Sequence, residues 1–448
     1  MSLALYSLLM WALQPFLRLK LRLRARKEAG YRHAAWERFG RYEESSAGAT
    51  QDFGSQRPDA GPLIWMHAVS LGETRACAVL LQALRRQWPG MRLLLTHSTA
   101  TGRDEGAKLL QSGDQQVWLP WDTAGAALRF LQHFKPGIGV LIETEVWPNL
   151  LQACRRQGIP VALVNARMNE KSARRAQYLA PLARQAYGAL SMVLAQTEQD
   201  AQRLRSLGAK VNAVLGNLKF DAEPDTEQLA TGRAWGRRSR RPQLMLASSR
   251  EGEEQLLLDA LRERGAPLER GGEDGARYAA RWLIVPRHPQ RFEEVASLVQ
   301  ARGLSLSRVS QWQGGPDEQA LACDVWLGDT LGDMALYYGM SDAALLGGSF
   351  APLGGQNLIE AAACACPVVM GPHTYNFAEA AEQALACGAA FRVASMGHAL
   401  VAVQDLLGQA QTLRDAAHAG LVFSAAHRGC AVRTATALRN LAASTQRG

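Results

Sequence analysis

The sequence predicts an α/β protein with two doubly wound, Rossmann-like domains. In the first half of the chain, short apolar runs such as 63–67, 138–142 and 161–165 alternate with amphipathic helical patterns. A second series of apolar runs extends from 244–247 to 368–370. Strands that alternate with helices form parallel sheets with right-handed crossovers. Because 448 residues are too many for one hydrophobic core, we expect one domain for each series.

Changes in composition predict the domain boundaries. Residues 221–242 are polar and rich in Pro and Gly, so we expect a linker there. The predicted segments are an apolar and basic N-terminal segment at 1–27, a first domain at 28–220, the linker at 221–242, a second domain at 243–425, and a C-terminal helix and tail at 426–448. Ligands of doubly wound sheets bind at the carboxyl ends of the strands, so with two facing domains we expect the site in a cleft between them.

The N-terminus predicts a membrane anchor. Its first 17 residues are apolar and uncharged, and a dense basic stretch follows at 18–27. A signal peptide would carry its positive charge before the apolar run. The run is shorter than the roughly 20 residues that span a bilayer, and Pro15 interrupts it. We expect either a marginal span or a helix in the interface, with its basic end on the cytoplasmic side and near anionic lipids. A buried N-terminal helix is the alternative.

The charge and the cysteines narrow the class of protein. The net charge of +9 predicts an anionic partner, which could be nucleic acid, a phosphorylated substrate or an acidic membrane surface. The seven cysteines are scattered and odd in number, which indicates reduced thiols in the cytoplasm. No Cys and His spacing resembles a zinc site.

The most informative motif follows the first apolar run and reads Ser70-Leu71-Gly72-Glu73. A strand, a small-residue loop and a helix form the layout that binds anions at a helix N-terminus, but a carboxylate repels phosphate. Glu73 suits a proton acceptor better. The alternative is a capping box, in which Ser70 and Glu73 only terminate the helix, and the spacing favours neither hypothesis.

A second acidic site, Glu143 and Glu145, directly follows the buried run 137–141. Charge is costly at the end of a buried strand, and close carboxylates shift each other's pKa. The pair is therefore a candidate for acid–base chemistry. The alternative is one solvated acid and one acid paired with an arginine.

The second half of the chain carries several strand-to-helix turns that could hold a phosphate and a ribose. Glycine turns let backbone N–H groups approach a phosphate, and acidic residues accept hydrogen bonds from ribose hydroxyls. The candidates are Arg287, His288, Gly328, Asp329, Gly347, Gly348, Ser349, Asn357 and Glu360. Helix capping is the alternative for the pairs Thr330 with Asp333 and Asn357 with Glu360.

Taken together, these motifs resemble the 3-deoxy-D-manno-octulosonate (Kdo) transferases of lipopolysaccharide assembly, which have the GT-B glycosyltransferase fold. The resemblance covers nearly the whole chain. It rests on H-A-V-S-L-G-E at 67–73, E-T-E-V-W-P-N at 143–149, L-K-F-D at 218–221, E-G-E-E at 251–254, V-P-R-H-P at 285–289, G-D-T-L-G-D at 328–333, G-G-S-F at 347–350 and G-G-Q-N-L-I-E-A-A at 354–362.

The resemblance implies an inverting transfer of Kdo from CMP-Kdo to the lipid A precursor lipid IVA, with release of CMP, at the cytoplasmic side of the inner membrane. It implies that Glu73 is the general base and that Glu145, with Glu143 beside it, is the second functional acid. Lys219 joins the donor-binding candidates of the second half. No metal, no cofactor and no nucleic acid are implied.

Three positions depart from the family pattern, namely Gln356, Arg250 and Asp333, and the first could alter a donor contact. Two rival functions remain. A sugar-nucleotide epimerase can share the GT-B fold but needs no membrane anchor. A basic membrane- or RNA-binding module would not need two acids at a strand end, and aromatic-spaced basic stretches typical of RNA binding are absent.

Overall fold

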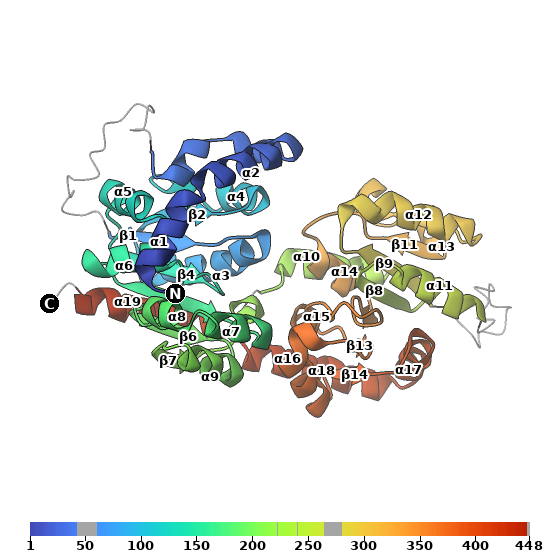
Figure 1. Cartoon of the computed structure of the whole chain (residues 1–448). Coiled ribbons are helices and arrows are strands. Elements are labelled where there is room, and N and C mark those ends of the chain that lie inside the picture. Colours follow the sequence, from blue (N-terminus) through green and yellow to red (C-terminus); the bar gives the residue numbers. More distant parts are fainter. Residues whose placement is uncertain (43–60, 222, 240, 264–279, 446–448) are drawn as a thin grey trace, which may run out of the picture. The chain divides into compact units, whose positions relative to one another are not determined.

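The computed structural model describes residues 1–42, 61–221, 223–239, 241–263 and 280–445 (Figure 1). The chain forms two compact units. The first unit consists of residues 1–221 and 429–448, and the second unit of residues 222–428. The prediction of two doubly wound α/β domains is confirmed, because each unit has a parallel sheet.

In the described part of the first unit, seven parallel strands have the order β3-β2-β1-β4-β5-β6-β7. They are β1 (Leu63–His67), β2 (Arg92–His97), β3 (Gln115–Trp118), β4 (Ile138–Ile142), β5 (Val161–Ala166), β6 (Met192–Ala195) and β7 (Val211–Val214). The chain leaves β1 toward β2 on one side and later returns to β4 on the other side. The carboxyl ends of β1 and β4 therefore flank the topological switch point, where ligands of such sheets bind.

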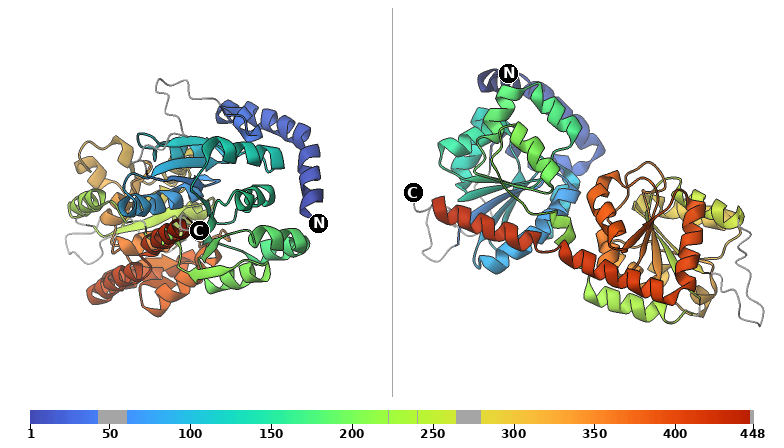
Figure 2. Two further views of the ribbon diagram at one scale, coloured as in Figure 1. Left: turned by 90° about the vertical axis from the view of Figure 1, so that its left-hand side faces the viewer. Right: turned by 90° about the horizontal axis from the view of Figure 1, so that it is seen from below.

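Helices cover both faces of this sheet (Figure 2). They are α3 (Leu71–Gln87), α4 (Ala100–Ala107), α5 (Ala124–Phe134), α6 (Pro148–Arg156), α7 (Glu170–Gln177), α8 (Ala180–Tyr187), α9 (Glu198–Ser206) and α19 (Cys430–Thr445). Strand β1 contributes to both hydrophobic cores, since Trp65 packs with α5 on one face while Ile64 and Met66 pack with α3 and α19 on the other. The C-terminal helix, predicted as a separate segment, is thus part of the first unit.

In the described part of the second unit, seven parallel strands have the order β10-β11-β9-β8-β12-β13-β14. They are β8 (Gln243–Ser249), β9 (Arg281–Pro286), β10 (Leu306–Arg308), β11 (Val325–Leu327), β12 (Ala343–Leu346), β13 (Val368–Met370) and β14 (Ala390–Arg392). The switch point lies between β8 and β12, so their carboxyl ends are the expected nucleotide edge.

The helices of the second unit include one that the sequence analysis missed. They are α10 (Thr226–Gly236), α11 (Glu253–Glu263), α12 (Phe292–Ala301), α13 (Glu318–Ala322), α14 (Met334–Met340), α15 (Leu358–Ala363), α16 (Ala378–Ala386), α17 (Met396–Gly408) and α18 (Ala410–Ala426). Helix α10 occupies half of the stretch 221–242 that we predicted as a linker. It packs against α14 so closely that a Cβ on Gly232 would collide with the carbonyl oxygen of Leu336. This glycine, read as a loop residue, serves helix packing instead.

The N-terminal segment forms two helices, α1 (Leu3–Ala12) and α2 (Gln14–Lys27), followed by the 3-10 turns η1 (Ala29–Arg32) and η2 (Ala35–Phe39). Helix α1 has no buried residue, so the alternative of a buried N-terminal helix is wrong there. The hydroxyl of Ser7 donates to Asn149 Oδ1 at 2.6 Å, which ties α1 to the start of α6. Within the described ranges, no helix is both long enough and apolar enough to cross a membrane.

Candidate functional site

Glu73 lies in the first turn of α3, directly after the carboxyl end of β1. The side chain of Ser70 caps the helix by accepting a hydrogen bond from the Glu73 N–H at 3.4 Å. The Glu73 carboxylate folds back on its own loop, where Oε2 accepts from the N–H of Val69 at 2.7 Å. Thr99 holds this loop in place. It donates to the Val69 carbonyl from its hydroxyl at 2.8 Å and from its N–H at 3.1 Å. Glu73 therefore has the geometry of a cap, with the N–H donor one residue earlier than in a standard capping box.

Glu143 and Glu145 follow β4, the strand next to β1 in the sheet. The backbone of Glu143 has a φ of 65° and is left-handed, a conformation that costs free energy in a residue with a Cβ. It is held there by two backbone hydrogen bonds, from its N–H to the Val164 carbonyl and from the Arg167 N–H to its own carbonyl. Backbone strain of this kind concentrates at functional sites. The structure therefore strengthens the case that this turn belongs to a functional site.

The three acids form one electrostatic cluster. Burial raises the pKa of Glu73 from 4.5 to about 7, the Val69 N–H opposes this rise, and the charges of Glu143 and Glu145 add to it. Burial also raises the pKa of Glu145. A carboxyl group with a pKa near 7 is poised to gain and lose a proton at neutral pH, which a simple helix cap does not need. The cluster brings together the acids that the sequence analysis singled out as separate motifs.

Lys219 completes this cluster. It lies in η3 (Leu218–Asp221), and its Nζ donates to Glu143 Oε1 at 2.8 Å. Asn165, at the end of β5, orients the turn by accepting the N–H of Leu218 on its Oδ1 at 3.0 Å. The ammonium group therefore neutralises one of the three acids, and its predicted contact with the donor stays a prediction.

The glycine turn of the second unit differs from the expectation of an open phosphate-binding loop. The N–H of Gly348 donates to Glu253 Oε2 at 2.6 Å, and the N–H of Phe350 donates to Glu253 Oε1 at 3.0 Å. The N–H groups of Arg250 and Ala351 donate to the same carboxylate. Glu253 is fully buried, so a carboxylate of the chain itself takes the position that we expected for a phosphate. Nothing in the sequence distinguishes this acid from its neighbours Glu251 and Glu254.

The other residues of this turn support the backbone. A Cβ on Gly347 would collide with the carbonyl oxygen of Ser248, so only glycine allows β12 to approach β8 at this point. The hydroxyl of Ser349 donates to the Leu346 carbonyl and accepts the Gly371 N–H at 2.8 Å. Gly347 thus allows the two strands to approach, and the Ser349 hydroxyl forms its hydrogen bonds within the chain.

Arg287, His288 and Glu360 remain the candidates of the second unit for contact with a ligand. Arg287 and His288 are exposed at the end of β9. Burial raises the pKa of Tyr338, the charge of Glu360 raises it further, and the charge of Arg287 opposes the rise. Tyr338 therefore interacts electrostatically with both Glu360 and Arg287. These two residues lie on the same edge of the sheet as the Gly347 turn.

Three predicted ligand-binding residues have structural roles instead. Asp329 accepts from the N–H and the hydroxyl of Ser310 at 2.9 and 2.8 Å, and a Cβ on Gly328 would crowd Tyr337. Asn357 caps α15 by accepting the Ile359 N–H at 3.1 Å. The Thr330–Asp333 capping box is wrong, since Thr330 bonds to Tyr337 and Asp333 makes no side-chain cap.

The three departures from the family pattern lie in loops near the carboxyl ends of the strands of the second unit. The amide nitrogen of Gln356 would lie 3.1 Å from a Cβ built on Gly348, so this side chain borders the glycine turn. Arg250 pairs with Glu251 at 3.2 Å, and Asp333 accepts from Gln228 at 3.2 Å. In the described part of the chain, no group of three or more His, Cys, Asp or Glu side chains is arranged to hold a metal ion.

Comparisons with known proteins agree on one family. The family model of 3-deoxy-D-manno-octulosonic-acid transferase (kdotransferase) matches residues 33–222. A 3-deoxy-D-manno-octulosonic acid transferase of Bordetella pertussis is 44% identical over 440 residues, which cover 97% of this chain and 98% of that protein. The corresponding protein of Haemophilus influenzae is 29% identical over 436 residues, with 96% of each chain covered.

Solved structures are similar in fold. A glycosyltransferase from Rickettsia africae has a TM-score of 0.56 at 14% identity and covers 84% of this chain and 97% of its own. The UDP-GlcNAc 2-epimerase of Neisseria meningitidis has a TM-score of 0.55 at 15% identity and covers 84% of this chain and 100% of its own. These likenesses confirm the predicted GT-B class of fold, which transferases and epimerases share.

Proposed function

The chain belongs to the Kdo transferase family of glycosyltransferases, and we propose that it transfers Kdo from CMP-Kdo to the lipid A precursor lipid IVA with inversion at the anomeric carbon. The observation that carries this proposal is Glu73, a half-buried carboxyl group whose pKa is raised to about 7 beside two further acids. The family membership alone would support glycosyl transfer without saying which group acts.

In the proposed reaction, Glu73 accepts the proton of an acceptor hydroxyl. The hydroxyl oxygen then forms a bond to the anomeric carbon of Kdo, and the bond from that carbon to the phosphate oxygen of CMP breaks, so that CMP leaves with the electron pair. A single displacement of this kind inverts the anomeric carbon. One base is sufficient for it, and general-base catalysis contributes about 10²–10⁴ in rate.

The other acids support Glu73. Burial raises the pKa of Glu73, and negative charge on Glu143 and Glu145 raises it further toward the range for proton transfer near neutral pH. The pairing of Lys219 with Glu143 limits this repulsion, because one of the two neighbours is neutralised. We assign the second functional acid to Glu145, which the resemblance implies.

For the donor, we propose that Arg287 and His288 meet the phosphate of CMP-Kdo and that Glu360 meets its ribose. The two basic residues are exposed at the carboxyl end of β9, where an anion can reach them. Glu253 and Gly347 act indirectly in this proposal, since they hold the neighbouring turn in shape.

We also propose that the N-terminal helices bind the cytoplasmic face of the inner membrane. Helices α1 and α2 expose large apolar side chains, among them Trp11 at 67% and Phe16 at 61%. On α2 these alternate with exposed basic residues such as Arg18 and Arg22. An apolar face beside basic side chains is typical of a helix in the interface of an anionic bilayer.

Mass spectrometry of the product tests the proposed activity. The purified chain is incubated with lipid IVA and either CMP-Kdo or UDP-GlcNAc. We expect the lipid to gain the mass of one or more Kdo residues with CMP-Kdo only, and the same spectrum gives the number added. An unmodified lipid would contradict the proposed transfer. Epimerisation of UDP-GlcNAc would favour the epimerase.

The membrane proposal has a separate test. Replacing Leu8, Trp11 and Phe16 by Ser is expected to shift the protein from sedimenting with anionic vesicles to the supernatant. Leu331→Ser, which alters an equally exposed side chain in the second unit, is the control. Unchanged sedimentation of the triple variant would contradict the proposed anchor.

A further inference from the structure

Helix α1 turns its two polar side chains toward the rest of the first unit. Tyr6 and Ser7 are half-buried, and so are Leu3 and Met10, one turn to either side. These four positions have the i, i+3, i+4, i+7 spacing of a single helix face. The other large side chains of α1 are exposed, namely Leu5, Leu8, Leu9 and Trp11. Helix α1 therefore has one face for the protein and another for an apolar partner, which we proposed above to be the bilayer.

The face of α1 that meets the protein bonds to a buried polar network at the start of α6. The Ser7 hydroxyl donates to Asn149 Oδ1 at 2.6 Å, and Asn149 Nδ2 donates to the Asp122 carbonyl at 2.8 Å. The Asp122 carboxylate accepts the N–H groups of Asn149 and Leu150 at 3.1 and 2.9 Å, which caps α6. The Tyr6 hydroxyl forms a hydrogen bond to the same carboxylate. Two side chains of α1 thus complete the cap of α6.

The start of α6 also fixes one end of the loop that carries Glu145. This loop runs from the end of β4 to Trp147, which holds the N-cap position of α6 but forms no side-chain cap itself. Glu143 is held at the other end by backbone hydrogen bonds to Val164 and Arg167. Only Asp122 and its partners on α1 and α6 hold the Trp147 end in place of the missing cap. A displacement of the start of α6 therefore displaces Glu145.

The attachment of α1 is weak without a bilayer. A helix of 10 residues is marginal in water, and none of the residues of α1 is buried. The Ser7 hydroxyl has an alternative acceptor in the Leu3 carbonyl at 2.8 Å, so it stays satisfied when it leaves Asn149. Burial of the exposed leucines in a bilayer interface would stabilise the helical form of α1. Tyr6 and Ser7 reach their partners from one face of that helix, so a bilayer that stabilises the helix also stabilises its docking.

We propose that Tyr6 and Ser7 are positioning residues that couple the binding of an anionic bilayer to the arrangement of residues 143–150. On the bilayer, α1 is helical, both hydroxyls bond to the start of α6, and the loop keeps Glu145 in its place near Glu73. Away from the bilayer, α1 undocks and the loop loses this support. The chain is then most active where a lipid acceptor is present. This inference rests on the proposed function, since it requires the membrane anchor and a role for Glu145 in the transfer.

Hydrogen exchange of the full chain, with and without phosphatidylglycerol vesicles, tests the coupling. We expect saturating vesicles to slow the exchange of the Asn149 and Leu150 amides at least about fivefold in the wild type. The double variant Tyr6→Phe/Ser7→Ala keeps the exposed leucines and should still sediment with vesicles. Because it lacks both hydroxyls, the slowing of exchange should fall below about twofold.

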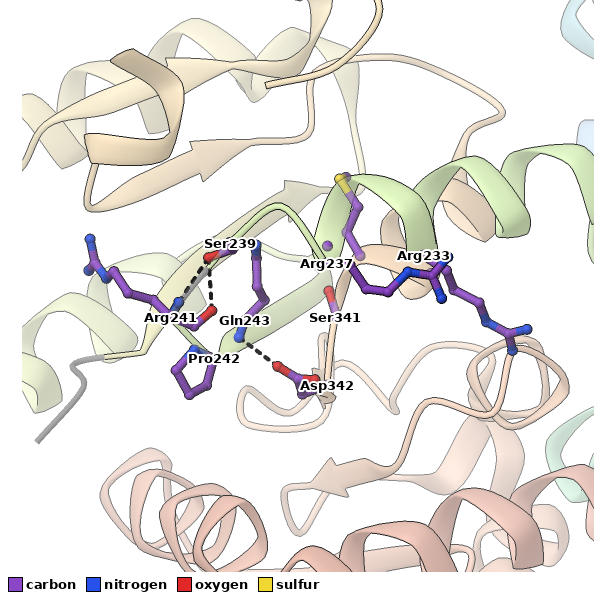
Figure 3. Close-up of a pocket in the computed structure, with 11 residues that line it drawn as sticks. Arg233, Arg237, Ser239, Arg241, Pro242, Gln243, Ser341 and Asp342 are labelled. Carbon is purple, nitrogen blue, oxygen red and sulfur yellow. Dashed lines mark hydrogen bonds between the residues drawn. The ribbon is translucent and has the colours of Figure 1, made fainter. Parts of the chain in front are cut away.

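An amide of the second unit provides the internal reference. The Gln243 N–H also donates to a carboxylate, that of Asp342 at 2.8 Å, beside the pocket shown in Figure 3. Its exchange should be the same with and without vesicles. The matched control variant is Leu5→Ala/Leu9→Ala, which alters only exposed side chains of α1. It should need more vesicles for sedimentation but show the full slowing of the Asn149 and Leu150 amides once it is bound.

Turnover on vesicles that contain lipid IVA shows whether the two hydroxyls position the reaction. We expect Tyr6→Phe/Ser7→Ala to lower kcat at least about tenfold and to leave the KM for CMP-Kdo unchanged, because the donor site is intact. Ser7→Thr retains the hydroxyl and should keep kcat within about threefold of the wild type. A role of α1 in folding alone would not separate kcat from KM in this way.

Three results would overturn the proposal. These are wild-type protein that sediments with vesicles without slower exchange at Asn149 and Leu150, equal slowing in the wild type and Tyr6→Phe/Ser7→Ala, or an unchanged kcat in that double variant. A wild type that does not sediment would overturn the coupling together with the anchor, and sedimentation identifies this case. The exchange experiment uses no Kdo transfer, so its failure is distinguishable from a failure of the proposed reaction, which leaves the lipid unmodified.

Discussion

Glu73→Gln separates a general base from a helix cap, because only a carboxyl group with a raised pKa destabilises the fold when it ionises. The amide oxygen of Gln can still accept the Val69 N–H that Glu73 accepts at 2.7 Å. The substitution therefore retains the cap but removes the ability to ionise.

The size of the effect follows from the pKa of Glu73. Raising that pKa from 4.5 to about 7 corresponds to about 3 kcal/mol, at 1.36 kcal/mol per pKa unit. Because the folded pKa lies above the unfolded one, this contribution to stability is complete below pH 4.5 and is lost as the pH rises through 7. Gln cannot ionise and avoids the loss. Glu73 retains some contact with solvent, so we expect Glu73→Gln to be more stable than the wild type by about 2–3 kcal/mol at pH 8.

Native-state hydrogen exchange of the β1 amides measures this difference, since it reports the opening of the first unit alone. We expect no difference between variant and wild type at pH 4 and a growing difference up to pH 8. Ser70→Ala is the matched control, because it removes the other half of the cap and should cost about 1 kcal/mol at every pH. If Glu73→Gln is no more stable than the wild type at pH 8, the pKa of Glu73 is not raised and Glu73 is only a cap.

Three further substitutions test the supporting structure. Lys219→Met should lower the free energy of unfolding by about 1–2 kcal/mol, because it leaves the half-buried Glu143 unpaired; urea denaturation measures this, and an unchanged midpoint would show that the pair contributes nothing. Glu253→Gln should abolish CMP binding in calorimetry, since an amide cannot accept all four N–H groups of the turn. The control Glu251→Gln, at an exposed position, should bind CMP normally. Equal CMP affinities of the two variants would refute this role of Glu253. Gly347→Ala should lower the melting temperature by the equivalent of about 1–3 kcal/mol because its Cβ meets the Ser248 carbonyl, whereas Gly408→Ala, with open space around its Cβ, should not; similar melting temperatures would contradict this account of Gly347.

The fold could be predicted because both sheets are parallel and buried on both faces. Their strands are continuous apolar runs, and the run at 63–67 coincides with β1. Helix α10, which lies inside the predicted linker, could not be predicted, because close contact between its glycines and α14 stabilises it and glycine in a sequence indicates a loop. The role of the C-terminal helix also depends on contacts with α3 that are distant in sequence.

The candidate site was predictable in part for a similar reason. Carboxylates at strand ends are visible in a sequence, so Glu73, Glu143 and Glu145 could be named. Their cooperation depends on β1 and β4 being neighbours, which only the strand order of the sheet determines. Glu253 was missed because its four backbone donors come from its own turn and from residues almost a hundred positions away. The left-handed backbone of Glu143 likewise has no sequence signature.

The most direct test of the account is the single-turnover rate of Kdo transfer from CMP-Kdo to lipid IVA in Glu73→Gln and Ser70→Ala. We predict that Glu73→Gln lowers this rate by at least about 10²-fold at pH 8, while Ser70→Ala stays within about threefold of the wild type. A Glu73→Gln protein that transfers Kdo at the wild-type rate would show that Glu73 is a cap and that the base lies elsewhere.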